Sequence, residues 1–266
     1  MRIYSDKIAL VKNSRGVWDL DTIKGCYYGT VENPNGCYDS CYAVRLAKRS
    51  GVNFSIPVKR HFTNRSHLKE IVNQLKNIDM PFVRIGTDGD PSHYWNHTFD
   101  IIKKIRPACN NIVIITKHWN PIPNNFAKNL NGIYVNTSIS ALDSPAQIKY
   151  RLAEYEHLKS FCYSILRVNT CKFNINNPIG KAFNDMQLKL LDNENVLDTI
   201  LRFSKNHNLV KSSVVIIDKT KYLKSEVYAS VNDNDTYFGA CDKCPELCGV
   251  GMFKRYENYK LQLKLF

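Results

Sequence analysis

The chain of 266 residues has no apolar run that approaches the ~18 residues a membrane-spanning helix needs. Its first residues, Met-Arg-Ile-Tyr-Ser-Asp-Lys, lack the apolar segment of a secretory signal, so we expect a cytoplasmic protein without a membrane partner. Internal repeats and low-complexity stretches are also missing. With 44% hydrophobic and 11% aromatic residues, the composition excludes a disordered chain.

Acidic residues are scarce: 24 Asp and Glu stand against 37 Lys and Arg, which gives a formal net charge of +13. Between Cys41 and Lys69 there is no acidic residue at all. That span holds seven basic residues, Arg45, Lys48, Arg49, Lys59, Arg60, Arg65 and Lys69, with His61, Phe62, Asn64 and His67 among them. Basic, aromatic and amide side chains together suit phosphate contacts and base stacking, so residues 41–69 predict a nucleic-acid or nucleotide partner. A Lys- and Asn-rich composition, or a solvated helix face, is the alternative.

Short apolar runs alternate with helical patterns along most of the chain. Strands are expected at residues 17–23, 82–85, 111–116, 133–138, 161–168 and 213–218. Helices are expected from Ser66, from Ser92, from Ser144 and across 194–207. The alternation predicts an α/β fold with parallel strands, as a doubly wound sheet or an incomplete barrel. In both folds, ligands bind at the loops that follow the strands.

Nine cysteines, an odd number in a chain expected in a reducing compartment, indicate metal binding rather than a disulfide framework. Cys26, Cys37 and Cys41 have the spacing C-x10-C-x3-C in a polar loop after the first expected strand. Three thiolates from one loop suit an iron–sulfur cluster with one iron open to a ligand. Zinc with a fourth ligand or a water is the competing interpretation.

A second cysteine group lies in the tail. Cys241, Cys244 and Cys248 have the spacing C-x2-C-x3-C, which suits a second Fe–S cluster or a structural zinc ion. Cys171 is the candidate fourth ligand of this group, while Cys109 and Cys162 are expected to be core or strand cysteines. His93 and His97 lack the acidic residue of a metalloprotease motif between them, so we expect them at the surface or at the mouth of the fold.

The segment Gly36-Cys37-Tyr38-Asp39-Ser40-Cys41-Tyr42-Ala43 resembles the radical S-adenosylmethionine (SAM) superfamily. It is most similar to the phage- and plasmid-associated branch with a Gly-Cys-x-x-Cys-Tyr-Ala motif. Over roughly residues 17–218, further segments agree in order: Gly-Thr-Asp-Gly-Asp-Pro at 86–91, Ile-Ile-Thr-Lys at 114–117, Val-Asn-Thr-Ser-Ile-Ser at 135–140, and the strand expected to end at Arg167. The chain departs from the family's C-x3-C-x2-C core in having C-x10-C-x3-C.

The resemblance implies a partial (β/α)6 TIM-like barrel, expected over residues 1–221. From about Tyr222 the strand–helix repeat stops, so residues 222–266 are interpreted as a Cys-rich extension of that domain. It implies a 4Fe–4S cluster on Cys26, Cys37 and Cys41 that cleaves SAM reductively to methionine and a 5′-deoxyadenosyl radical, with electrons from a donor such as ferredoxin or flavodoxin. The positions that match SAM contacts are Gly86, Thr87, Asp88, Gly89 and Asp90 for the amino group, Ser138 and Ser140 near the ribose or carboxylate, Arg167 or Lys117 for the carboxylate, and Tyr42 beside the cluster. Turn, helix-cap and loop roles are the alternatives at the Gly, Asp and Ser positions.

Together these features predict a radical SAM enzyme that modifies a nucleic acid or nucleotide at an unactivated C–H position. One alternative is a radical SAM enzyme that modifies a peptide or protein with the help of an auxiliary Fe–S cluster. The other is a non-enzymatic, zinc-dependent nucleic-acid-binding protein.

Overall fold

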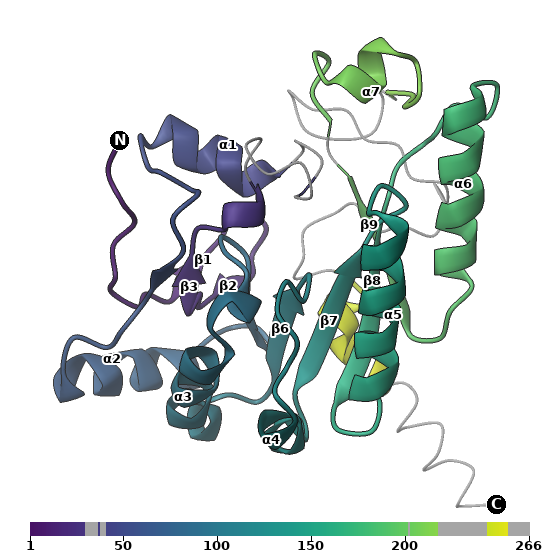
Figure 1. Cartoon of the computed structure of the whole chain (residues 1–266). Coiled ribbons are helices and arrows are strands. Elements are labelled where there is room, and N and C mark those ends of the chain that lie inside the picture. Colours follow the sequence, from purple (N-terminus) through teal and green to yellow (C-terminus); the bar gives the residue numbers. More distant parts are fainter. Residues whose placement is uncertain (30–36, 38–40, 202, 218–243, 255–266) are drawn as a thin grey trace, which may run out of the picture.

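A computed structural model describes residues 1–29, 37, 41–201, 203–217 and 244–254 (Figure 1). Its centre is a seven-stranded sheet in the order β1-β2-β5-β6-β7-β8-β9, parallel throughout except for the β1–β2 pair. The strands are β1 (Val11–Lys12), β2 (Trp18–Asp19), β5 (Val83–Ile85), β6 (Ile112–Thr116), β7 (Tyr134–Ile139), β8 (Tyr163–Thr170) and β9 (Val196–Ile200). A separate antiparallel pair joins β3 (Ile23–Lys24) to β4 (Val58–Lys59). The expected α/β class with a mainly parallel sheet is confirmed.

Helices α1 to α6 lie between the parallel strands in the chain, and α7 follows the last of them. The helices are α1 (Tyr42–Arg49), α2 (Arg65–Lys76), α3 (Trp95–Ile105), α4 (Asn124–Ala127), α5 (Pro145–Leu158), α6 (Pro178–Leu191) and α7 (Asn208–Lys211). Short 3-10 turns are η1 (Tyr27–Gly29), η2 (Pro91–Tyr94), η3 (Arg106–Ala108), η4 (Lys128–Leu130) and η6 (Leu247–Gly249). None of the helices in the described part of the chain has the length and apolar character needed to cross a bilayer.

The two faces of the sheet pack against different partners, because consecutive strand residues point to opposite sides. Ile114 packs in a cluster with residues of α2 and α3, and Leu166 packs in a cluster with residues of α5 and α6. On the other face, Tyr134 and Ile165 pack against Val250 of the C-terminal segment 244–254. Figure 1 shows α5 in front of β7 and β8 and this segment, in yellow, behind them. The C-terminal segment therefore covers the sheet face opposite α5.

Two expected strands differ from the structure. The first, 17–23, is divided between β2 and β3, because the chain turns at Asp21 and leaves the main sheet to pair with β4. The last, 213–218, is wrong: the final parallel strand is β9, inside the range 194–207 where a helix was expected. Of the described part of 213–218, Val215 forms only an isolated bridge with Phe173. The β-branched residues of β9 pair with β8, and this pairing overrides the apparent helical spacing.

The helix starts agree only in part. Ser144 forms the expected cap of α5, in a capping box with Gln147. Helix α2 is instead capped by Asn64, whose side chain accepts from His67 N. Ser92 lies inside η2, and α3 begins at Trp95. In α5, α2 and η2, the residue with an oxygen acceptor aimed at the first free N–H groups defines the helix start, whereas α3 continues from η2 without a side-chain cap.

Candidate functional site

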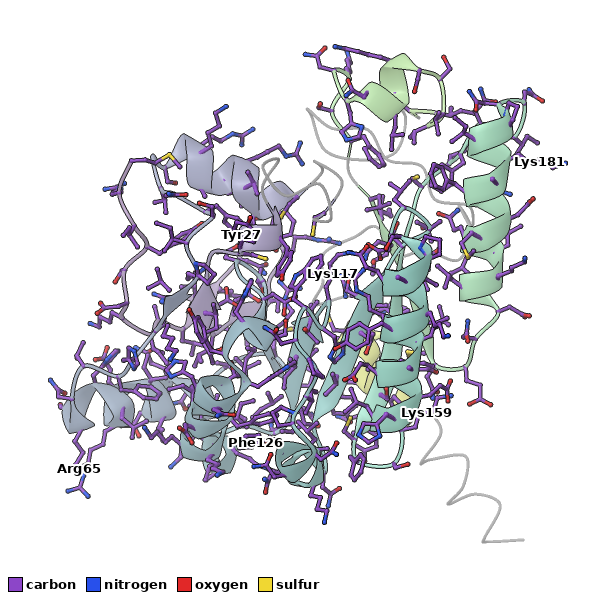
Figure 2. The ribbon with its side chains drawn as sticks, in the orientation of Figure 1. Tyr27, Arg65, Lys117, Phe126, Lys159 and Lys181 are labelled. Atoms are coloured by element: carbon purple, nitrogen blue, oxygen red, sulfur yellow. The ribbon has the colours of Figure 1, made fainter. Side chains whose placement is uncertain are left out.

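The loops at the carboxyl edge of the sheet carry most of the candidate residues. Figure 2 shows Tyr27 and Lys117 at this edge, with Phe126 at the opposite end of the molecule. Tyr27 follows β3, and Lys117 follows β6. Lys117 therefore lies where its parallel strand ends, as expected, whereas Ser138 and Arg167 lie inside β7 and β8 rather than in the loops after them.

The loop Gly86–Asp90 is held by a buried carboxylate that the sequence did not single out. Asp21 is 2% exposed and accepts hydrogen bonds from the N–H groups of Gly86 (2.8 Å), Thr87 (2.8 Å) and Asp88 (3.0 Å). Lys24 pairs with Asp21 at 3.2 Å and also with Asp88. Three consecutive N–H groups converge on one acceptor, so the loop has a fixed shape.

Other contacts tie the same loop to its surroundings. Tyr42 Oη donates to the carbonyl of Thr87 at 2.5 Å, which joins the first turn of α1 to the loop. Gly89 bridges to Gly25, and Gly25 N donates to the carbonyl of Asp88 at 2.9 Å. The loop thus lies beside the residue that precedes Cys26. Of the candidate SAM contacts, Tyr42 and the loop form one connected unit.

Asp90 serves the helix-capping role that was its alternative. Its carboxylate accepts from Ser92 N (2.9 Å) and Ser92 Oγ (2.7 Å) at the start of η2. It also accepts from Thr116 Oγ1 (2.7 Å) and Lys117 N (2.8 Å) at the end of β6. Asp90 therefore joins the loops after β5 and β6, and its oxygens are occupied by protein donors.

The first cysteine group lies at the same edge. Cys26 is buried just beyond β3, Cys41 is the N-cap of α1, and Cys37 is half-buried. Burial raises the pKa of the Cys26 thiol well above its ordinary value, and the charges of Asp90, Cys37 and Cys41 add to this. Burial likewise raises the pKa of Cys37 to about 12, against the opposing charge of Lys117. Cys37 N donates to the carbonyl of Tyr28 at 2.8 Å, which ties Cys37 to the loop that carries Cys26.

An aromatic stack flanks Cys26. His93 Nε2 lies 3.2 Å from Cys26 Sγ, and the His93 ring is parallel to that of Tyr28 at 5.8 Å and 14°. Tyr28 in turn stacks on Trp119, with centroids 4.2 Å apart and planes 13° apart. The guanidinium of Arg151 lies 4.7 Å from the Trp119 ring. His93 was expected only as a surface or mouth residue.

Lys117 takes part in a buried ion cluster around Asp143. The Asp143 carboxylate lies 3.0 Å from Lys117 Nζ and 2.7 Å from Arg151 Nη1, and it accepts from Ser140 N at 2.8 Å. Burial alone would raise the pKa of Asp143, but Lys117 and Arg151 outweigh it and hold that pKa below its usual value. Asp143 and Arg151 went unnoticed in the sequence, because nothing in their local pattern distinguishes them from ordinary surface charges.

The candidates on β7 and β8 form a separate polar row. Ser138 Oγ accepts from Asn169 Nδ2 at 2.8 Å, and Asn169 Oδ1 accepts from Thr199 Oγ1 at 2.8 Å. Arg167 pairs in register with Ser138 but does not end its strand, since β8 continues to Thr170. Ser140 is fully buried, and its Oγ accepts from the N–H of Leu142, as the loop-hydroxyl alternative predicts.

The tail cysteines are only partly described, since Cys241 lies outside the described residues. Cys248 packs with Tyr134 and Ile165 on the sheet face opposite α5, and its carbonyl accepts from Asn136 Nδ2 at 3.0 Å. Burial would lower the pKa of Arg84, but the charge of Cys248 and then that of Asp19 raise it. Cys244 and Cys248 also interact electrostatically. Cys248 therefore lies near Arg84, on the sheet face opposite α5.

Cys171 lies elsewhere. It is 1% exposed in a cluster with Phe173 and Phe203, and its N–H and carbonyl both bond the side chain of Gln187. The structure does not bring it together with Cys248, which belongs to a different cluster. Within the described residues, no three His, Cys, Asp or Glu side chains stand together as a metal-binding group.

The basic span 41–69 divides between surface and interior. Lys48, Arg49, Lys59, Arg65 and Lys69 are exposed, whereas Arg60 is 8% exposed. Helix α1 carries Lys48 and Arg49 and starts directly at Cys41. Part of the basic surface is thereby attached to the cysteine loop.

No protein-family model, curated protein or solved structure matches the chain.

Proposed function

We propose that the chain is a radical SAM enzyme acting on a nucleic acid or nucleotide. One observation supports this most directly. Cys26 follows Gly25, which bridges to Gly89, and Cys41 precedes Tyr42, which bonds the carbonyl of Thr87, so both cysteines adjoin the fixed Gly86–Asp90 loop. Cys37 N donates to the carbonyl of Tyr28, two residues beyond Cys26. Thiolates are the usual ligands of Fe–S clusters, so the donor set fits a 4Fe–4S cluster.

The strand order supports a partial (β/α)6 barrel over a doubly wound sheet. Six parallel strands lie side by side in chain order, namely β2, β5, β6, β7, β8 and β9. A doubly wound sheet has a point where the strand order reverses, and the strands of the described residues have none. Crossovers of one hand then place their helices on one face. The opposite face is left for the C-terminal segment and the polar row that includes Arg167.

Cys26, Cys37 and Cys41 would hold a 4Fe–4S cluster, which would supply the electron, drawn from an external reductant, for reductive cleavage of SAM to methionine and a 5′-deoxyadenosyl radical. The chain's own residues fix the shape of this site. Asp21 fixes the Gly86–Asp90 loop, and Tyr42 links that loop to α1. The charge of Lys117 opposes the rise in the pKa of Cys37 that burial causes, and Asp143 partly balances that charge. Lys117 and Arg167 are the cations we assign to the SAM carboxylate.

The exposed basic side chains of α1 support an anionic substrate. Lys48 and Arg49 are both exposed, and the helix begins at Cys41, a proposed cluster ligand. A phosphate backbone bound along α1 would be held close to the radical. This proposal predicts a binding affinity that falls steeply with salt, because cationic contacts release counterions from the nucleic acid.

Anaerobic reconstitution tests the activity. We expect the protein to take up iron and sulfide, and to form 5′-deoxyadenosine from SAM once a reductant is added. Cys26→Ala, Cys37→Ala and Cys41→Ala should each abolish the product. Cys109→Ala is the matched control, because Cys109 packs against the helix cluster away from the site. A protein that takes up no iron, or an equal loss in the control, would contradict the proposal.

The substrate class is tested separately. The double substitution K48Q/R49Q removes two exposed charges from α1, and K103Q/K104Q removes two exposed charges from α3. Both variants have the same net charge, so an effect of total charge would weaken them equally. We expect only the α1 variant to lose affinity for single-stranded nucleic acid and to show a shallower salt dependence. Salt-insensitive binding would instead favour the peptide-modifying alternative.

A zinc protein is the second candidate, because of one contact. His93 Nε2 lies 3.2 Å from Cys26 Sγ, and three Cys with one His form a common structural zinc set. Metal analysis of the protein as purified separates the two. A colourless protein with stoichiometric zinc supports the non-enzymatic alternative, and a brown protein with iron and sulfide excludes it.

A further inference from the structure

We infer that His93 is a positioning residue that donates a hydrogen bond from Nε2 to the sulfur of Cys26 and thereby raises the reduction potential of the bound cluster. The inference rests on the proposed function, since it requires a cluster on Cys26. It assigns a role to a residue outside the cysteine motif, which the sequence placed only at the surface or mouth.

The His93 ring is held in place by its own turn, η2, and by the loop that carries Cys26. Asp90 caps η2 through Ser92, and His93 N donates to the carbonyl of Asp90. Tyr28, two residues beyond Cys26, lies parallel to the imidazole. A ring fixed by backbone and stacking contacts has little freedom to turn its Nε2 away from the sulfur at 3.2 Å.

The direction of the hydrogen bond follows from the chemistry of the ligand. A metal-bound thiolate carries no proton, so its sulfur only accepts. The proton must then lie on His93 Nε2, the nitrogen that faces Cys26 Sγ. With Cys26 bound to iron, His93 is therefore a donor to one of the three ligand sulfurs.

A donor at a ligand sulfur changes the redox balance of the cluster. Reduction adds negative charge to the cluster and its thiolates, and an N–H group aimed at sulfur stabilises that charge. Hydrogen bonds to the sulfurs are among the factors that set Fe–S reduction potentials. Removing the His93 donor should make the cluster harder to reduce, at an unchanged iron content.

The experiment compares three variants of the reconstituted full chain. His93→Phe keeps a flat ring beside Tyr28 but removes the donor, whereas His93→Gln restores an N–H at a similar reach. His97→Phe is the matched control, because His97 lies one turn further on, with Nε2 2.9 Å from the carbonyl of Arg60 and its ring against His61. Iron content, circular dichroism and the midpoint potential from an EPR-monitored titration are measured for each.

We expect His93→Phe to retain the cluster with a more negative midpoint potential, and His93→Gln and His97→Phe to remain close to the unsubstituted protein. An unchanged potential in His93→Phe overturns the inference and leaves the proposed function intact. Loss of iron from folded His93→Phe also overturns it, because His93 would then be a ligand. An unsubstituted protein that forms no cluster overturns both.

A second measurement does not depend on folding of the variants. In the unsubstituted protein labelled with 15N-histidine, pulsed EPR of the reduced cluster should detect one weakly coupled nitrogen, as expected across a hydrogen bond. A strong coupling, typical of a direct ligand, or no coupling at all would overturn the inference.

Discussion

The rings of Tyr28 and Trp119 are stacked with centroids 4.2 Å apart and planes 13° apart. Tyr28 belongs to the loop after β3 that carries Cys26, and Trp119 belongs to the loop after β6. The stack therefore fastens the cysteine loop to the carboxyl edge of the main sheet. Arg151 of α5 lies near the Trp119 ring and reaches Asp143, so the site is continuous with the buried ion cluster.

Replacing Asp143 should destabilise the fold. Asp143→Asn leaves Lys117 and the buried Arg151 without their shared counter-charge. Breaking a buried ion pair by removing one partner costs about 3–5 kcal/mol, and we expect a loss in this range from urea unfolding. Glu156→Gln is the control on the same helix as Arg151, at an exposed pair with Lys159, and should change the unfolding midpoint little. An equal effect of the two substitutions would contradict the role given to Asp143.

Replacing Asp21 should loosen the loop beside Cys26. In Asp21→Asn, one acceptor oxygen becomes an N–H2 group that faces backbone N–H groups of Gly86–Asp88. Charged hydrogen bonds contribute roughly 1.5–3 kcal/mol each, so we expect a loss of about 2–3 kcal/mol. Hydrogen exchange at residues 86–88 should quicken. Asp100→Asn, on the exposed side of α3, is the control, and unchanged exchange in Asp21→Asn would refute the prediction.

Gly86 should not tolerate a side chain. Its φ is +94°, and a Cβ would lie 2.1 Å from the carbonyl oxygen of Ile115. Strain plus the clash should make Gly86→Ala about 2–5 kcal/mol less stable. Gly51, with φ +65° and open space around it, is the matched comparison, and Gly51→Ala should lose only about 1–2 kcal/mol. Thermal unfolding measures both, and a larger loss at Gly51 would speak against the tight approach of the two strands.

His118 should make stability depend on pH between about 6.5 and 4. Burial, with Arg151 adding to it and Asp90 opposing it, lowers the pKa of His118 to about 4. A folded-state pKa below the unfolded value of about 6.5 gives a stabilising contribution that is complete above pH 6.5 and is lost as the pH falls toward 4. The shift corresponds to about 3 kcal/mol.

The measurement is the urea midpoint at pH 7 and pH 4.5. His118→Gln can keep a bond to Thr137 Oγ1 but does not titrate, so its midpoint should change less with pH than that of the unsubstituted protein. His157→Gln, at an exposed position of α5, is the control and should follow the unsubstituted profile. Parallel profiles for all three proteins would show that His118 does not contribute.

Local signals predicted well wherever a few neighbouring residues decide the outcome. The apolar runs at 111–116 and 133–138 correspond to β6 and β7, and Ser144 caps α5 as expected. Strand burial and helix capping depend on a few residues that are adjacent in the chain, so the sequence alone predicts them. The same holds for Lys117 and the Gly86–Asp90 loop, which follow β6 and β5, but not for Ser138 and Arg167, which lie inside their strands.

The secondary structure of residues 194–218 could not be predicted from local signals. Residues 196–200 can be spaced along a helix or a strand, and only pairing with β8 selects the strand. Residues 213–217 have the composition of a buried strand, but β9 already occupies the place beside β8. Two segments compete for the place beside β8, and a short stretch of sequence does not show which of them takes it.

By itself the sequence determined the α/β class, the parallel sheet and the loops that carry Cys26 and residues 86–90, because hydrophobic periodicity and turn residues act over short range. Only the tertiary structure decided which side chains support one another there. Asp21 meets residues 86–88, Asp143 meets Lys117 and Arg151, and His93 meets Cys26. Asp21 and Gly86 are 65 positions apart, Lys117 and Asp143 are 26 apart, and Cys26 and His93 are 67 apart. They meet only because the sheet aligns the ends of their strands.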